Sequence, residues 1–334
     1  MNPLAQHEKL APGVGVWGVG NHAQRSTLPA LSECPAVRLV GLTTRSEKVR
    51  EEQARKWNCK AWKTPRDMLQ DPEVEVVYLA TPVGLHHEHG LLALQAGRHL
   101  WCEKSLTASL DTSQELVEVS TELDVALCEA FMYQHHPQFR QVLQWIVDGQ
   151  IGQIRSISSR FGFPHLGPDD IRYVRELGGG ALLDVGCYPL SAALAIAGEE
   201  PDGVHAVLGR DEGYAVDTAG SALLRFPSGI SALLEWGFGR AYRNELEVWG
   251  EDGTIIAERA FSKPPDLSPR TVLRRQDGTV VDSDIPPANQ FVHMFATFAG
   301  VLEADAAREE HRRRALRQAR TVAAVLESAH LTGI

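Results

Sequence analysis

The stretch V-G-V-W-G-V-G-N-H-A at residues 14–23 decides the fold. Its first five residues have the composition of a short buried strand, and the rest is a G-x-G-x-x-A turn that opens a helix. In such a turn Gly18 permits a sharp bend, Gly20 allows the backbone to approach a pyrophosphate, and Ala23 lets helix and strand pack closely. The N–H groups at the start of that helix attract phosphate. We therefore predict a dinucleotide-binding unit at the start of the chain.

Short apolar runs continue to alternate with amphipathic stretches up to residue 130, a pattern typical of a parallel sheet covered by helices. The expected strands are residues 14–18, 37–42, 74–80, 99–103 and 125–130, and the expected helices are 46–57, 86–97 and 110–123. Beyond Pro137 one helix precedes strand-like runs joined by S-G and D-G turns, at 154–163, 218–238, 245–258 and 271–281. Such hairpins predict a second sheet that is open and mainly antiparallel, and the spacing from Asn289 onward is helical. The predicted fold class is α/β, with a doubly wound parallel sheet followed by this second sheet.

Length and charge narrow the class of protein. The chain has 334 residues, and its 33 basic and 43 acidic residues give a net charge of −10. The length favours two domains, and the charge makes nucleic acid and anionic membranes poor partners. The five cysteines form no C-x-x-C pair, so neither a disulfide framework nor a zinc site is expected. Because no signal peptide or long apolar run is evident, we expect a cytoplasmic protein.

The end of the second expected strand indicates which cofactor binds. An NAD-binding unit places an acidic residue about 20 positions after the glycines, on the ribose 2′-hydroxyl. This chain has T-T-R-S at 43–46 instead, with no carboxylate to repel a 2′-phosphate. Arg45 would pair with that phosphate while Thr44 and Ser46 donate hydroxyls. We predict NADP(H) in preference to NAD(H); the alternative is that Arg45 is only a solvated loop charge.

Two further motifs supply candidates for catalysis. Lys104, in C-E-K-S at 102–105, ends a strand at the same sheet edge as A-T-P at 80–82, where ligands of open α/β sheets bind. The stretch G-G-G-A-L-L-D-V-G-C-Y-P at 178–189 places Asp184 and Tyr188 four residues apart, on one face of a helical turn. The alternatives are that Asp184 only caps the helix and that Tyr188 is only a half-buried core residue.

Taken in order, G-V-G-N-H-A, A-T-P-x-x-L-H, A-G-x-H-x-x-C-E-K, E-A-F-M and G-G-G-A-L-L-D-V-G-C-Y resemble the motifs of the glucose-fructose oxidoreductase, inositol dehydrogenase and MocA (Gfo/Idh/MocA) family. The resemblance implies a leader over 1–12, a nicotinamide-binding Rossmann domain over 13–134, and a substrate-binding and oligomerisation domain over 135–334. It also implies a homodimer or homotetramer formed through the C-terminal sheet. The C-terminal helix, from about residue 289, is expected to pack back on the first domain.

The same resemblance assigns roles to the candidates. Tyr188 stands where the family has His or Tyr, as in the glucose-fructose oxidoreductase, dihydrodiol dehydrogenase and sugar 3-ketoreductase branches. It would donate a proton to the alkoxide that forms when hydride reaches a carbonyl. Lys104 would lower the pKa of that phenol and stabilise the oxyanion, and Asp184 would orient a substrate hydroxyl and keep Lys104 charged.

The remaining site residues are expectations from motif position. Cofactor contacts are expected from Gly18, Gly20, Asn21, His22, Ala23, Thr44, Arg45, Ser46, Ala80, Thr81, Pro82, His86, Glu103 and Lys104, and substrate contacts from Arg160, Arg172, Tyr173 and Arg240. No metal is expected, because the adjacent histidines point to different faces and no acidic cluster accompanies them. One departure from the family is Ser105, which replaces the usual proline after the lysine. In the family this peptide bond is often cis, so either the bond here is trans and the lysine sits differently, or local contacts offset a cost of about 2.5–4 kcal/mol.

Three functions remain open from the sequence. The first is an NADP(H)-dependent oxidoreductase that reduces the 3-keto group of a nucleotide-diphosphate deoxysugar, because F-G-F-P, D-I-R-Y and L-G-G-G-A-L-L-D-V-G-C-Y-P-L resemble enzymes of that kind. The second is a free-sugar or diol dehydrogenase of xylose, glucose or dihydrodiol type. The third is a non-catalytic nicotinamide-sensing regulator. Retention of Lys104, Asp184 and Tyr188 together argues against the regulator, which has no use for a proton donor.

Overall fold

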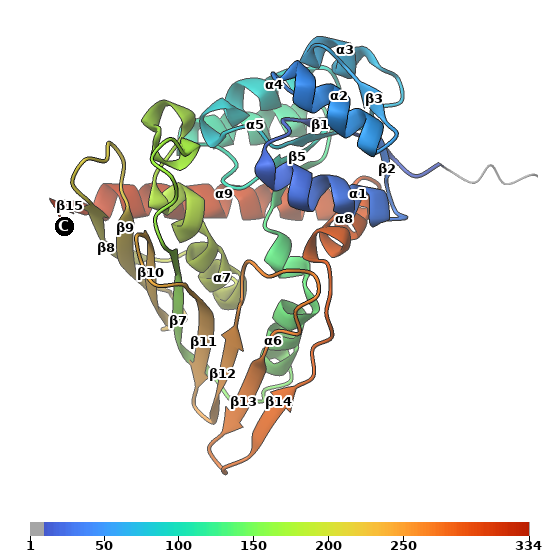
Figure 1. Cartoon of the computed structure of the whole chain (residues 1–334). Helices are drawn as coiled ribbons and strands as arrows, with labels where there is room; N and C mark the ends of the chain where they lie inside the picture. The colour runs from blue at the N-terminus through green and yellow to red at the C-terminus, as the bar shows by residue number, and fades with distance from the viewer. Residues whose placement is uncertain (1–9, 334) are drawn as a thin grey trace, which may run out of the picture.

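A six-stranded parallel sheet forms the first half of the protein (Figure 1), in a computed structural model that describes residues 10–333. The strand order is β3-β2-β1-β4-β5-β6, so the chain reverses direction across the sheet beside β1. Ligands of such sheets bind at this reversal, outside the carboxyl ends of the strands. The elements are β1 (Gly13–Trp17), η1 (Ala23–Thr27), α1 (Leu28–Glu33), β2 (Arg38–Thr43), α2 (Glu47–Lys56), β3 (Lys60–Ala61), α3 (Pro65–Gln70), β4 (Val76–Leu79), η2 (Val83–Leu85), α4 (His86–Gln95), β5 (His99–Glu103), α5 (Leu110–Glu122) and β6 (Leu127–Ala130).

The second half is built on a nine-stranded sheet with the order β14-β13-β12-β11-β7-β10-β9-β8-β15. Its pairs are antiparallel except β7 with β10 and β8 with β15. The predicted fold class is therefore confirmed. The elements are η3 (Met132–His135), α6 (Pro137–Val147), β7 (Ile154–Phe163), η4 (Ile171–Tyr173), η5 (Arg175–Leu177), η6 (Leu182–Gly186), α7 (Cys187–Ala197), β8 (Gly203–Arg210), β9 (Ala219–Arg225), β10 (Ser231–Phe238), β11 (Arg243–Gly250), β12 (Gly253–Glu258), β13 (Thr271–Arg275), β14 (Val280–Ser283), α8 (Gln290–Val301), α9 (Asp305–Ser328) and β15 (His330–Gly333).

The long helix α9 connects the two halves (Figure 1). Its buried Arg312 donates through Nη2 to the carbonyl oxygens of Ser120, at 2.8 Å, and Val125, at 2.9 Å, in the first domain. Two turns further on, Gln318 Nε2 donates to the carbonyl oxygen of Cys187, at the start of α7. One hydrophobic core accordingly extends from the first sheet into the second. These contacts fix the position of α7 relative to the ends of the parallel strands.

The helix α7 lies inside this core. The segment Arg175–Ala197 is long and apolar enough to cross a membrane by length and composition, but 78% of its apolar window is buried within the protein. Its apolar side chains, such as Leu190 and Leu194, pack between the second sheet and α9. The apolar character of the segment is explained by this interior position.

Candidate active site

The glycine turn after β1 has the shape that a dinucleotide requires. Gly18 has φ +99°, and a Cβ there would lie 2.7 Å from the carbonyl oxygen of Ala80, so no larger residue fits. A Cβ on Gly20 would meet nothing within 4 Å, which leaves open space beside the backbone. Asn21 and His22 are exposed and begin the following helix, whose first N–H groups have no partner within the helix. Buried Ala23 packs beneath the turn. The turn therefore fits a pyrophosphate.

The end of β2 carries an unpaired cation. Arg45 is exposed, and no carboxylate in the described part of the chain pairs with it. Ser46 caps α2, because its hydroxyl accepts from the N–H of Val49 at 3.3 Å. Thr44 is half-buried beside it. This arrangement leaves Arg45 available for a 2′-phosphate.

His86 joins the loops that follow β4 and β5. Its side chain is fully buried, with Nε2 2.7 Å from the carbonyl oxygen of Thr81 and Nδ1 2.9 Å from that of Ser105. Burial lowers its pKa, and a neutral imidazole carries one N–H, which it donates to one of these oxygens. We expected His86 to contact the cofactor; the structure instead places it beneath the loops. Ala80, Thr81 and Pro82 remain at the strand edge, half-buried.

The peptide bond between Lys104 and Ser105 is cis, although Ser105 is not a proline. The hydroxyl of Ser105 donates to the carbonyl oxygen of Leu183, at 3.2 Å, and its own carbonyl faces His86. The lysine thereby keeps the backbone geometry that the family resemblance implied. Lys104 is directed across the domain boundary.

Lys104, Asp184 and Arg172 form a buried charge network. The ammonium of Lys104 donates to Asp184 Oδ1 at 2.9 Å and to the Asp184 carbonyl oxygen at 2.8 Å, and Arg172 Nε donates to Oδ2 at 2.7 Å. Burial opposes the charge on Lys104, yet Asp184 raises the pKa of the ammonium above its usual value. Burial would raise the pKa of the Asp184 carboxyl, but Lys104 and Arg172 together hold it low. All three groups are therefore charged near neutral pH.

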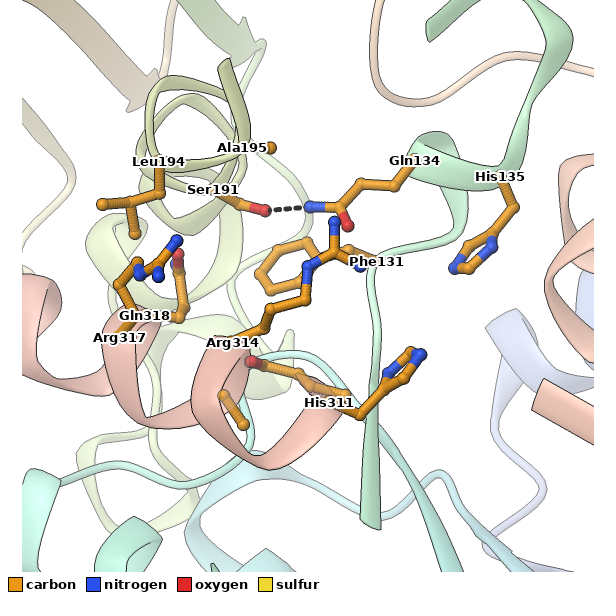
Figure 2. A pocket seen from close by; sticks show the side chains of 12 residues that line it. Phe131, Gln134, His135, Ser191, Leu194, Ala195, His311, Arg314, Arg317 and Gln318 are labelled. Atoms are coloured by element: carbon orange, nitrogen blue, oxygen red, sulfur yellow. Dashed lines mark hydrogen bonds between the residues drawn. The ribbon is translucent and has the colours of Figure 1, made fainter. Parts of the chain in front are cut away.

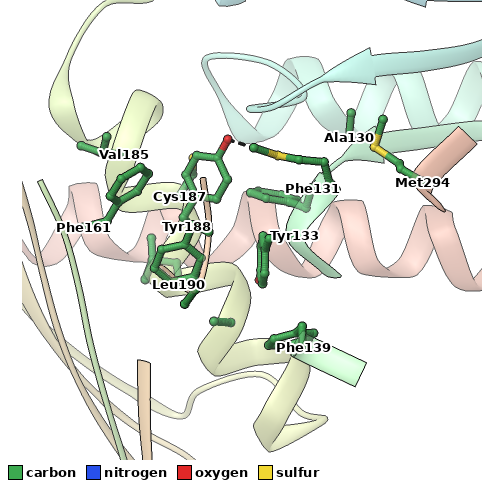
Figure 3. Close-up of a cluster of buried hydrophobic side chains, with 14 of the residues drawn as sticks. Ala130, Phe131, Tyr133, Phe139, Phe161, Val185, Cys187, Tyr188, Leu190 and Met294 are labelled. Atoms are coloured by element: carbon green, nitrogen blue, oxygen red, sulfur yellow. Dashed lines mark hydrogen bonds between the residues drawn. The ribbon is translucent and has the colours of Figure 1, made fainter. Parts of the chain in front are cut away.

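Tyr188 lies beside this network, within an aromatic cluster (Figure 3). It is 5% exposed, Lys104 Nζ lies 5.1 Å from its ring centroid, and its hydroxyl donates to Met132 Sδ at 3.6 Å. Burial raises the pKa of the phenol strongly, and the opposing effect of Lys104 is smaller. Lys104 therefore lowers this pKa as expected, but its effect does not bring the pKa below the usual value, because burial outweighs it. The phenol keeps its proton near neutral pH.

The chain forms a π-helical turn over Leu182–Gly186 before α7 begins, so Asp184 lies in this turn and Tyr188 in the first turn of α7. Gly180, with φ +126°, starts this turn, and a Cβ there would lie 2.3 Å from Asp217 Oδ1. Asp217 accepts from the N–H of Leu182 at 2.7 Å through its side chain. A π-helical turn inserts one residue into a helix and often marks a functional site. Asp184 is not the residue that caps the helix.

Comparison with known proteins identifies the family. The description "Oxidoreductase family, NAD-binding Rossmann fold" matches residues 13–131, and "GFO/IDH/MocA C-terminal domain" matches 139–256. The chain belongs to the Gfo/Idh/MocA family. It is 35% identical over 318 residues to the dTDP-3,4-didehydro-2,6-dideoxy-alpha-D-glucose 3-reductase of Streptomyces antibioticus, covering 95% of this chain and 97% of that one.

Other Gfo/Idh/MocA members are similar over most of the chain. A 3-ketoreductase from Actinomadura kijaniata, in a crystal structure with NADP and TDP-benzene, superposes with a TM-score of 0.91 at 33% identity, covering 97% of this chain and 99% of that one. D-xylose 1-dehydrogenase (NADP(+)) 2 of Haloferax volcanii is 33% identical over 264 residues, 78% of this chain and 80% of that one. The protein is an NAD(P)-dependent oxidoreductase of a sugar-converting family.

The carboxylate of Glu103 contacts two side chains, Tyr78 and His22. Tyr78 donates to Glu103 Oε1 at 2.5 Å, and His22 Nε2 lies 3.4 Å from the same oxygen. The carboxylate thus ties the end of β5 to the helix that follows the glycine turn. Glu103 thereby positions His22, and its own contact with the cofactor stays a prediction.

The four predicted substrate residues separate into two pairs. Arg172 reaches Asp184, and Tyr173 is buried nearby, where its hydroxyl accepts from the N–H of Leu166. Arg160 instead pairs with Glu235 and, at 3.2 Å, with Glu245.

The ion pairs of Arg160 lie on the outer face of the second sheet, away from the catalytic groups. Phe161, the next residue to Arg160 along β7, packs against Tyr188 from the inner face, and successive strand residues alternate between faces. Arg240 lines a groove on the same outer face as Arg160. The expectation that Arg160 and Arg240 contact the substrate is corrected accordingly.

Three residues of the site were not assigned roles from the sequence. Met132 accepts from Tyr188, Tyr78 donates to Glu103, and Glu129 accepts from the N–H of Leu106 at 2.8 Å. Burial raises the pKa of Glu129 to about 8. Glu129 and Met132 belong to the E-A-F-M motif, so the motif was visible and only the roles were not. Tyr78 lies in an apolar run without a motif around it, so the sequence does not single it out as a site residue.

Proposed function

We propose that this protein reduces the 3-keto group of a nucleotide-diphosphate deoxysugar with NADPH. The observation that carries the proposal is the placement of Tyr188 beside the Lys104–Asp184 pair at the carboxyl edge of the parallel sheet. The curated 3-reductases that resemble the chain over nearly its whole length act on dTDP-linked deoxysugars, which favours the same substrate class here.

Tyr188 is the proton donor in the proposed reaction. The bound cofactor supplies the hydride. The alkoxide that results needs a proton from a donor within about 2.6–3.2 Å of its oxygen. The buried phenol holds its proton, and the thioether of Met132 is a weak acceptor, so little is lost when the O–H turns to the substrate. A protonated phenol favours reduction over oxidation.

Lys104 stabilises the developing negative charge on the substrate oxygen. Its ammonium is held charged by Asp184 and lies over the ring that carries the donor hydroxyl. A preorganised charge in a water-poor site stabilises an oxyanion more than the same charge does in water. Arg172 holds the second oxygen of Asp184, so Asp184 is fixed from both sides. In this role Arg172 is a positioning residue.

The preference for NADPH rests on Arg45. The guanidinium is unpaired at the end of β2, and no acidic residue lies between Thr43 and Ser46. A phosphate at the ribose 2′ position would pair with it. The crystal structures similar to this chain include a 3-ketoreductase with bound NADP.

A thermal-shift experiment tests the substrate class. With NADPH present, thymidine diphosphate is compared with free xylose and glucose. The proposal expects the melting temperature to rise with thymidine diphosphate and to stay unchanged with the free sugars. Stabilisation by the free sugars alone would select a free-sugar dehydrogenase, for which the Haloferax volcanii relative is the precedent. Stabilisation by neither, with no turnover of either class, would favour a nicotinamide-sensing regulator.

The outer face of the second sheet is the proposed contact between subunits. Leu233 is 53% exposed and Trp249 61% exposed on this face, with Leu223 and Val207 exposed nearby. Exposed apolar patches of this kind mark protein interfaces. We expect a homodimer or homotetramer, and Leu233→Asp should reduce the mass measured by light scattering. An unchanged mass in the variant would exclude this face.

A further inference from the structure

A second cavity lies between η3, α7 and α9 (Figure 2), with Glu129 of β6 in its lining. Its volume is about 50 Å³, well above the roughly 10–15 Å³ that one water molecule needs. Figure 2 shows Arg314 and His311 of α9 directed towards Gln134 and His135 of η3. Gln134 Nε2 donates to the hydroxyl of Ser191, at 2.8 Å, in the cavity wall. The cavity is therefore lined mainly by polar and positively charged groups.

The positive charge in this lining has little compensation. Of the described residues that line the cavity, Glu129 is the only acid. Burial raises its pKa to about 8, so the carboxyl is neutral near pH 7. No carboxylate within residues 10–333 pairs with Arg317, and Arg314 has only the exposed Glu310, at 3.7 Å. An exposed pair of that kind contributes little.

The pKa values of the two histidines in the lining, His135 and His311, are both lowered. His135 is 7% exposed, and its pKa falls to about 3 because of burial and the positive charges around it. The charged groups among its neighbours are Arg314 on α9 and Arg140 on α6, whereas His293 on α8 has a lowered pKa and is neutral near pH 7. Burial lowers the pKa of His311 to about 4. The histidines of the lining are therefore neutral near pH 7, and its positive charge comes from Arg314 and Arg317, two side chains that favour an anion in the cavity.

One buried acceptor in the lining also lacks a partner. Gln318 is 5% exposed, and its Nε2 donates to the carbonyl oxygen of Cys187 at 3.0 Å. Its Oε1 is buried and finds no partner in the described part of the chain. An orphaned buried acceptor is costly, so a ligand with an O–H donor would satisfy it. The ligand that fits this lining is therefore an anion that also carries an O–H group able to donate a hydrogen bond.

The geometry points to a phosphate-binding site in this cavity, where a singly protonated phosphate group accepts from Arg314 and Arg317 and donates its O–H to Gln318. A phosphate group has four oxygens, so one group can meet Arg314, Arg317 and Gln318 together. Sulfate carries the same number of oxygens but no O–H near neutral pH, so it would leave Gln318 unsatisfied. The group is either free inorganic phosphate or the terminal phosphate of a monoester.

Isothermal titration calorimetry of the full chain tests the site. Inorganic phosphate is titrated at constant ionic strength with NADPH saturating, so that the cofactor's own phosphate contacts are filled. We expect one site per chain, with sulfate binding more weakly. The double variant Arg314→Gln/Arg317→Gln should weaken phosphate binding by at least about tenfold, because it removes two charge-assisted hydrogen bonds. Arg313→Gln is the matched control, since Arg313 is exposed on the same helix and pairs with Glu310.

Two further arms sharpen the outcome. Glucose 1-phosphate distinguishes the two sources of the group. If the site takes a phosphate monoester, glucose 1-phosphate binds at least as tightly as inorganic phosphate. If the cavity admits nothing larger than free phosphate, inorganic phosphate binds more tightly. Arg317→Gln alone is the fallback if the double variant melts early. Equal phosphate affinity in the wild type and the Arg317→Gln variant, no binding in the wild type, or sulfate binding as tightly as phosphate would each overturn the proposal.

Discussion

Asp184 lies 2.9 Å from the ammonium of Lys104, although the two residues are 80 positions apart and come from different domains. The contact fixes the loop after β5 against the π-helical turn before α7, so neither can move without the other. Arg172 closes the network at 2.7 Å from the second carboxylate oxygen. The position of Tyr188, one turn after Asp184, depends on this contact.

Replacing Tyr188 by phenylalanine tests the proton donor. The variant retains the buried ring and loses only the O–H that donates to Met132. We expect kcat for reduction to fall by about 10²–10⁴, the usual contribution of a general acid. The affinity for NADPH, measured by fluorescence titration, should not change. Tyr133→Phe is the control, because that neighbouring buried phenol bonds to Ser191 instead. Near-normal turnover in the Tyr188 variant would remove the residue from the mechanism.

Asp184→Asn should destabilise the fold as well as reduce activity. The change leaves Lys104 without a counter-charge and Arg172 with only Asp170. Removing one member of a buried pair costs on the order of 3 kcal/mol, because the remaining charge stays buried. Asp202→Asn, which breaks the exposed pair with Arg225, should cost under about 1 kcal/mol in the same chemical denaturation series. An equal loss of unfolding free energy in the two variants would show that burial of the network does not increase its contribution to stability.

Arg45→Asp tests the cofactor preference. An aspartate at the end of β2 would repel a 2′-phosphate and accept from a ribose hydroxyl, so kcat/KM should shift from NADPH towards NADH. Lys48→Asp is the matched control, since Lys48 is also exposed and lies in the first turn of α2. An unchanged ratio of kcat/KM values in the Arg45 variant would refute the role of this residue.

The sequence predicted the architecture well because its strongest signals are local. The glycine turn, the strand ends and the switch to hairpins after Pro137 all have direct correlates in backbone geometry, as with φ +99° at Gly18. The short β3 and the strand β8 were not predicted. β3 has two exposed residues and no pattern, whereas β8 does alternate, with Ala206 and Leu208 buried and Val207 exposed.

The site was less predictable because it depends on contacts between distant residues. The motif order placed Lys104, Asp184 and Tyr188 together, but not the 2.7 Å contact of Arg172 with Asp184. Side chains alternate between the two faces along β7, so the face that Arg160 occupies depends on the register of that strand. One sequence does not fix the register. The direction of the pKa of Tyr188 depends on the balance between burial and the charge of Lys104, which only the packed structure reveals.

Glu129 makes the stability of the protein depend on pH. Its carboxyl has a pKa of about 8 in the folded chain, owing to burial, against about 4.3 when unfolded. Between these values the folded state holds a proton that the unfolded state has released, so this group's contribution to stability falls as the pH rises. The loss is about 1.4 kcal/mol per pH unit at most, and a few kcal/mol from about pH 5 to about pH 8.

Glu129→Gln should remove that dependence, because the amide keeps an oxygen for the N–H of Leu106 and never ionises. The free energy of unfolding of the wild type, measured by urea denaturation, should therefore fall relative to the variant as the pH increases from about 5 to about 8. Glu122→Gln, an exposed change at the end of α5, should leave the wild-type profile intact. Parallel profiles for the wild type and the Glu129 variant would mean that the carboxyl is already ionised in the folded state. Glu129 would then carry a negative charge in the lining of the second cavity, and this charge would weaken the binding of an anion there.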